Sequence, residues 1–118
     1  MNHYRLRYKV WLESNKNKAF GKGPVEILDK IEKFGSLRKA ADEMQMSYSH
    51  AWTLINKIEK RLGCRLIERQ VGGEEGGGSI LTPKAKELIR RFNLFEEKSE
   101  RYLSILFNKF FADFDPES

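Results

Sequence analysis

The sequence has almost no cysteine and lacks the long apolar runs that build membrane spans. Cys64 is the single cysteine among 118 residues, so an intrachain disulfide is excluded and a reducing compartment is expected. No apolar run approaches the ~20 residues that cross a bilayer. The N-terminal stretch MNHYRLRYKVWL alternates charged with apolar residues and therefore lacks the apolar core of a signal peptide. We expect a soluble, cytoplasmic protein.

The sequence also lacks the motifs of a catalytic or metal site. His3, His50 and Cys64 are its strong soft-metal ligands, and their spacing matches no metal site. The glycine-rich stretch QVGGEEGGGSILTP has no Gly-Lys-Ser/Thr ending with which a phosphate-binding loop reaches a nucleotide. We therefore expect neither an enzyme nor a bound metal or cofactor.

Positive charge is present and is unevenly distributed. The formal net charge is +5 and the pI about 9.4, which favours an anionic partner. Residues 1–23 hold six Lys and Arg against one acid, whereas residues 83–118 hold seven of each sign. The excess therefore lies on a patterned segment and the polar stretch after it, and not on a disordered tail.

The N-terminal segment has the period of a β-strand. Apolar and basic residues alternate, the apolar ones being Tyr4, Leu6, Tyr8, Val10 and Leu12. This pattern predicts a half-buried strand with one basic face. The following ESNKNKAFGKG predicts a polar loop.

Three successive helices are predicted in the middle of the chain. Pro24 suits the first position of a helix that Gly35 closes. Ser36 and Ser47 are N-cap residues for the next two helices, which a short turn separates, and Gly63 ends the last of them. The core-facing stripe of the third helix consists of Ala51, Ile55, Ile58 and Leu62.

Two short strands and a long helix complete the chain. RLIERQV and SILT flank the glycine cluster and predict a hairpin, under which Cys64 is expected to pack as a small apolar group. Thr82 and Pro83 begin a helix that reaches Phe111, roughly 40 Å at 1.5 Å per residue. Its apolar residues step by three and four, a heptad seam typical of dimerisation: Ala85, Leu88, Phe92, Phe95, Ser99, Tyr102 and Leu106.

The order strand, helix, helix, turn, helix, hairpin describes a winged helix-turn-helix, a mainly α fold with a small β component. We assign residues 1–82 to this DNA-binding domain, residues 83–112 to a dimerisation helix and residues 113–118 to a frayed tail. The helix after the turn reads the DNA groove in such motifs. Its side opposite the apolar stripe carries no acid, a composition that suits phosphates and base edges but also a merely solvated face; it holds Ser49, Thr53, Asn56, Lys57 and Lys60, with His50 at the edge.

A longer stretch resembles a known family. GSLRKAADEMQMSYSHAWTLINKIEKRLGCRLIER, a glycine-rich hairpin and LTPKAKELI resemble the DNA-binding domain of LysR-type bacterial regulators, and more closely the N-terminal domain of the molybdate-responsive (ModE-type) regulators. The resemblance covers about residues 4–107. It implies a homodimeric transcription regulator on double-stranded DNA, with the long last helices paired. Carried over by position, the groove residues are Ser47, Tyr48, Ser49, His50 and Thr53, and Arg38 and Lys39 lie near backbone phosphates.

Two features depart from that family. Full-length molybdate regulators carry a second, oxyanion-binding region outside this resemblance, so we expect no bound molybdate. The hairpin carries Glu74 and Glu75 where a wing commonly has basic residues. We expect Gly73 and Gly76 to let backbone N–H groups approach phosphates, with the glutamates either turned away from DNA or limiting nonspecific binding.

Other functions remain open from the sequence. The main alternative is a dimeric protein-interaction module with weak or no DNA binding, and another is direct sensing of a small anion by the basic strand face or the dimer groove. Trp52 lies at the border of the core-facing stripe and is expected to pack in the core. For the dimer we expect an interface of Leu88, Phe92, Phe95, Tyr102 and Leu106.

Overall fold

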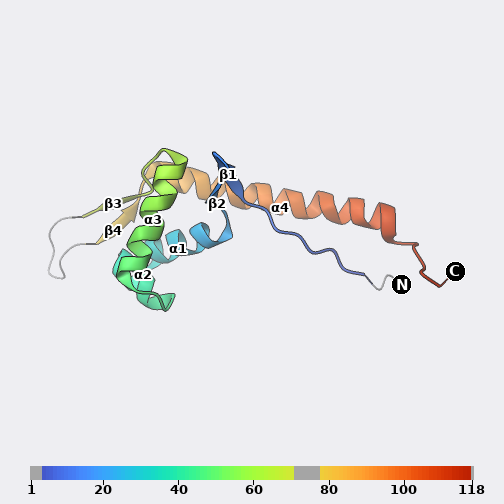
Figure 1. The fold of residues 1–118 in the computed structure, drawn as a ribbon, viewed down its shortest axis with the longest axis horizontal. Helices are drawn as coiled ribbons and strands as arrows, with labels where there is room; N and C mark the ends of the chain where they lie inside the picture. The colour runs from blue at the N-terminus through green and yellow to red at the C-terminus, as the bar shows by residue number, and fades with distance from the viewer. Residues whose placement is uncertain (1–3, 71–77, 118) are drawn as a thin grey trace.

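The residues that the structure describes form two small hairpins and four helices, the last of them long (Figure 1). The computed structural model describes residues 4–70 and 78–117. The elements are β1 Leu12–Ser14, β2 Asn17–Phe20, α1 Lys22–Phe34, α2 Leu37–Glu43, α3 Tyr48–Leu62, β3 Ile67–Arg69, β4 Ser79–Leu81 and α4 Pro83–Phe111. Each hairpin forms its own two-stranded antiparallel sheet. The mainly helical class with a small β component is confirmed.

The N-terminal strand differs from the prediction. Residues 4–11 belong to no strand, whereas β1 and β2 form a hairpin that begins at Leu12, the last residue of the predicted strand, and continues into the predicted polar loop. Asn15 and Lys16 have φ values of 51° and 67°, and positive φ at both central positions is what a type I′ turn requires. The usual sequence signal of that turn is Asn-Gly, so the lysine at the second position concealed it.

The predicted helix boundaries rest on caps that the structure contains. The side chains of Ser36, Ser47 and Thr82 each accept a hydrogen bond from the backbone N–H three residues later, at 3.0–3.1 Å. Gly35 and Gly63 end α1 and α3 with φ values of 82° and 79°. Among these boundaries only the start of α1 differs from the prediction. The helix begins at Lys22, so Pro24, the predicted first residue, lies inside its first turn.

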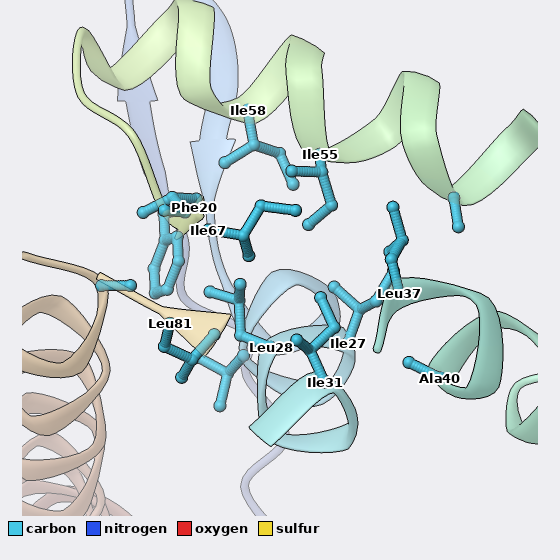
Figure 2. Close-up of a cluster of buried hydrophobic side chains, with 14 of the residues drawn as sticks. Phe20, Ile27, Leu28, Ile31, Leu37, Ala40, Ile55, Ile58, Ile67 and Leu81 are labelled. Atoms are coloured by element: carbon cyan, nitrogen blue, oxygen red, sulfur yellow. The ribbon is translucent and has the colours of Figure 1, made fainter. Parts of the chain in front are cut away.

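The core lies between α1, α2, α3 and the inner residues of both hairpins. Figure 2 shows Ile67 of β3 between Ile55 of α3 and Leu28 of α1. Ala40 is fully buried, and its small side chain allows α2 to approach α1 closely. Full burial of an aliphatic side chain stabilises the fold by about 1.5–3 kcal/mol. Side chains from both hairpins and from α1, α2, α3 and the start of α4 therefore hold the helix-turn-helix together.

α4 packs on this body only along its first part. The ring of Phe92 meets that of Phe20 edge to face, with centroids 5.6 Å apart. Beyond Phe92 the helix projects from the body, and the molecule measures 69 × 28 × 21 Å. Residues 4–11, here called the arm, run beside the projecting part of α4 (Figure 1). Much of α4 therefore stays exposed in a single chain.

Candidate nucleic-acid interface

The body of the domain fixes which side of α3 meets solvent. Ala51, Ile55 and Ile58 are buried against the core. The Ser47 cap fixes the start of the helix, and the side chain of Arg61 donates to the carbonyl oxygen of Lys18 at 2.7 Å near its end. Both ends of α3 are therefore held, and the helix presents one defined face outward.

That outward face is polar, cationic and free of carboxylates. The side chains that the sequence placed there are all exposed: Ser49, His50, Thr53, Asn56, Lys57 and Lys60. Glu59, the single acid of α3, points toward β3, where it accepts hydrogen bonds from the backbone N–H groups of Leu66 and Ile67 at 2.6 and 3.3 Å. The face can therefore meet phosphates without like-charge repulsion from its own helix.

Two predicted contact residues from different helices stack on each other. The guanidinium of Arg38 in α2 lies 4.4 Å from the centroid of the Tyr48 ring, at the start of α3. Arg38 remains exposed, whereas Tyr48 is half-buried and packs on the edge of the core. The stack fixes a cation beside the N-terminus of α3, where helix N–H groups already favour anions. Lys39 is also exposed on α2.

The base of the predicted wing is anchored to the helical body. β3 pairs with β4, from Ile67 with Leu81 to Arg69 with Ser79. The N–H of Ser79 donates to the carbonyl oxygen of Gly35 at 2.9 Å, and a Cβ on Gly78 would lie 2.5 Å from that oxygen. Gly78 is therefore required by close approach. The predicted contacts at residues 73 and 76 lie outside the described residues.

Sequence comparisons identify the family of this domain. A family model described as the bacterial regulatory helix-turn-helix protein, lysR family, matches residues 24–86, more than half of the chain. The chain belongs to the LysR family. That family comprises DNA-binding domains of transcription regulators and not enzymes, in agreement with the prediction.

Curated relatives of this LysR-type domain include transcriptional regulators named ModE. Over 82 residues it is 35% identical to the transcriptional regulator ModE of Haemophilus influenzae, covering 70% of this chain and 32% of that protein. It is 30% identical over 82 residues to the DNA-binding transcriptional dual regulator ModE of Escherichia coli strain K12, covering 70% and 31%. The chain thus matches about a third of the length of these relatives.

A solved structure supports the same fold. The crystal structure of the CbnR_DBD–DNA complex superposes with a TM-score of 0.50, covering 68% of this chain and 86% of that one, at 18% identity. An identity this low shows the shared fold alone.

Trp52 of the LysR-type domain is exposed, which corrects the expectation that it packs in the core. It is 46% accessible and borders a hollow of about 190 Å³ between α3 and β3. Asn56, Arg65 and Arg69 line the same hollow. Trp52 lies about 90° from the centre of the buried stripe, since each residue turns a helix by about 100°. The sequence analysis did not predict that the two arginines lie beside α3. The position of Arg69 in the first predicted strand of the hairpin could have indicated a cation at the base of the wing.

The predicted dimer residues fall into two groups in this LysR-type domain. Leu88 and Phe92 pack against the domain's own core, and Phe92 is only 4% exposed. Phe95, Tyr102 and Leu106 are exposed, at 55%, 68% and 48%. The first part of the seam therefore holds α4 to its own body, and only the later part is free to meet a second helix.

Within residues 4–70 and 78–117, no three His, Cys, Asp or Glu side chains gather closely enough to hold a metal ion. No helix in these ranges is long and apolar enough to cross a membrane. Cys64 is partly buried against the core, as predicted, and is a free thiol.

Proposed function

We propose that this chain is a homodimer that binds double-stranded DNA sequence-specifically at a pseudo-palindromic operator. We further propose that it regulates transcription in the cytoplasm. The observation that carries the proposal is the outward face of α3. The helix is held at both ends, and this face is polar and cationic. The one carboxylate of α3, that of Glu59, is turned toward β3. A recognition helix in the major groove needs such a surface.

Each group of side chains has a distinct role in this proposal. Ser49, His50 and Thr53, near the start of α3, contact base edges. Lys57, further along the same face, and Arg38 and Lys39 of α2 contact phosphates. A two-fold axis would place two copies of α3 about 34 Å apart, one turn of duplex.

Selection of bound duplexes from a random pool at two salt concentrations tests the proposal. We expect a palindromic motif. We also expect the logarithm of the binding constant to fall linearly with the logarithm of the salt concentration, with a slope of about −0.9 for each phosphate contact. A folded protein that enriches no motif and binds no duplex at low salt would contradict it.

The second candidate, a protein-interaction module, is favoured by the exposed apolar residues of α4. Those from Leu94 to Phe111 are roughly half or more accessible in a single chain, as large apolar interaction surfaces are. Size-exclusion chromatography with light scattering, with and without duplex, separates the candidates. DNA binding predicts a complex of two chains with one duplex, whereas the module predicts no complex with DNA.

A further inference from the structure

An exposed tryptophan lies on the flank of α3 that faces the base of the wing. Trp52 is 46% exposed and borders the hollow of about 190 Å³ between α3 and β3. Ser49 and Asn56, which are both exposed, lie within about 60° of it around the helix at 100° per residue. The polar outward face of α3 therefore ends, on the side of the wing, in an apolar ring.

This ring lies at the same depth along α3 as the side chains proposed to read bases. Trp52 is one residue before Thr53 and three after Ser49, so each lies within about 5 Å of it along the helix axis. Lys57, a proposed phosphate contact, lies about 8 Å beyond it. A helix that brings Ser49 and Thr53 to base edges therefore brings the indole ring there as well.

The opposite wall of the hollow is cationic. Arg65 is held in place, because its guanidinium lies 3.5 Å from the carboxylate of Glu59 and 3.5 Å from the carbonyl oxygen of Ile67. Glu59 also lines the hollow, but its carboxylate accepts the N–H groups of Leu66 and Ile67. Within residues 4–70 and 78–117, Arg69 at the end of β3 forms no ion pair. Its guanidinium is therefore available to a backbone phosphate.

The chemistry of the indole ring limits which base it can recognise. The ring offers an apolar surface and a single N–H donor. It lacks the paired hydrogen-bonding groups with which amide and guanidinium side chains identify adenine and guanine. The apolar group that base pairs present in the major groove is the C5-methyl group of thymine. Contact between that methyl group and the ring removes apolar surface of both from water, which is favourable.

We propose that Trp52 is a specificity-determining residue that contacts the C5-methyl group of a thymine in each half-site, while Arg69 across the hollow binds a nearby backbone phosphate. The proposal rests on the DNA binding proposed above, and it names one base of the operator and the residue that reads it. Trp52 then adds preference for one base, whereas Arg69 adds affinity for any duplex.

Replacement of thymine by deoxyuridine tests the contact, because it deletes the methyl group and keeps the hydrogen-bonding groups of the base. The duplexes selected from the random pool supply the operator, and each of its thymines is replaced in turn. At one position in each half-site we expect deoxyuridine to weaken binding of the unmodified protein about fourfold, the effect of exposing one methyl-sized group. Fluorescence anisotropy measures the dissociation constants.

Trp52→Ala is the matched variant. It should bind the thymine and deoxyuridine duplexes equally well at that position, because the methyl group has lost its partner, and it should stay folded, because the ring is exposed. Arg69→Ala should keep the fourfold effect of deoxyuridine, weaken all duplexes alike and reduce the salt slope by about one. Lys98→Ala, on the exposed side of α4, is the control cation and should change neither quantity.

The outcomes separate this inference from DNA binding itself. If the protein selects a motif but no thymine responds to deoxyuridine, or if Trp52→Ala leaves every such response unchanged, the indole ring does not read thymine and this inference is wrong. The DNA-binding proposal stands in both cases. If the folded protein binds no duplex at low salt, DNA binding fails and this inference fails with it.

Discussion

Thr53 and Lys57 lie one turn apart on the same exposed face of α3, and their side chains suit different parts of DNA. A threonine hydroxyl and methyl group read base edges, whereas an ammonium group binds phosphates of any sequence. The two residues therefore give a matched pair with which specificity and affinity can be separated.

Lys57→Ala should weaken binding to operator and nonspecific duplexes alike and reduce the salt slope by about one. Thr53→Ala should instead reduce the difference in binding free energy between operator and mismatched duplexes by about 1 kcal/mol, with little change in the salt slope. Fluorescence anisotropy at several salt concentrations measures both quantities. A Lys57→Ala protein that changed only sequence preference would show that the phosphate assignment is wrong.

Among the glycines that the structure describes, Gly78 is the one at which an added methyl group would meet backbone most closely. Gly78→Ala should push β4 away from the Gly35 carbonyl oxygen and destabilise the fold by about 1–3 kcal/mol, since the clash is with backbone. Gly23→Ala is the control, because nothing lies within 4 Å of a Cβ there and alanine is the better helix former. Thermal unfolding of the two proteins would reveal the difference; equal midpoints would contradict the close approach.

Glu59 connects two elements, the recognition helix and the first strand of the wing. Its carboxylate, whose side chain is only 10% exposed, accepts two backbone N–H groups at the start of β3 and lies 3.5 Å from the guanidinium of Arg65. Charged acceptors make stronger hydrogen bonds than neutral ones. The orientation of the wing relative to α3 therefore depends on this residue.

Glu59→Gln should lower the free energy of unfolding by about 1–2 kcal/mol, because the amide oxygen is a weaker acceptor than the carboxylate. Glu97→Gln on the exposed side of α4 should change it little. Urea unfolding followed by circular dichroism measures the difference. Equal stability of the two variants would mean that the Glu59 contacts contribute nothing to the fold.

At the scale of the whole molecule, α4 has two separate roles along its length. Its start, through Ala85 and Phe92, belongs to the core, whereas the stretch beyond is covered only in part by the arm. Charge introduced at these two places should therefore have different consequences.

Leu106→Asp should yield a folded monomer whose unfolding midpoint at low concentration matches that of the unmodified monomer. Phe92→Asp should destabilise the domain itself by several kcal/mol, because it removes a buried ring and buries a charge. Light scattering and thermal unfolding distinguish the two. An unchanged dimer with Leu106→Asp would place the interface elsewhere, for example along the arm.

The sequence predicted most elements because their signals are local. The caps at Ser36, Ser47 and Thr82 and the glycines after α1 and α3 act within one turn of the chain. The polar face of α3 followed from helical periodicity alone. The β1–β2 hairpin was missed because its turn uses Lys16 in a left-handed conformation, which residue type does not reveal.

The sequence by itself determined the order of elements, their caps and the residues that α3 presents outward, because backbone propensity and periodicity are properties of neighbouring residues. Tertiary structure alone decided that Trp52 is exposed, that Glu59 turns toward β3 and that Phe92 belongs to the body. It also decided where α3 and β3 leave an open hollow. These outcomes depend on segments distant in the sequence, whose relative positions are set by how the core packs.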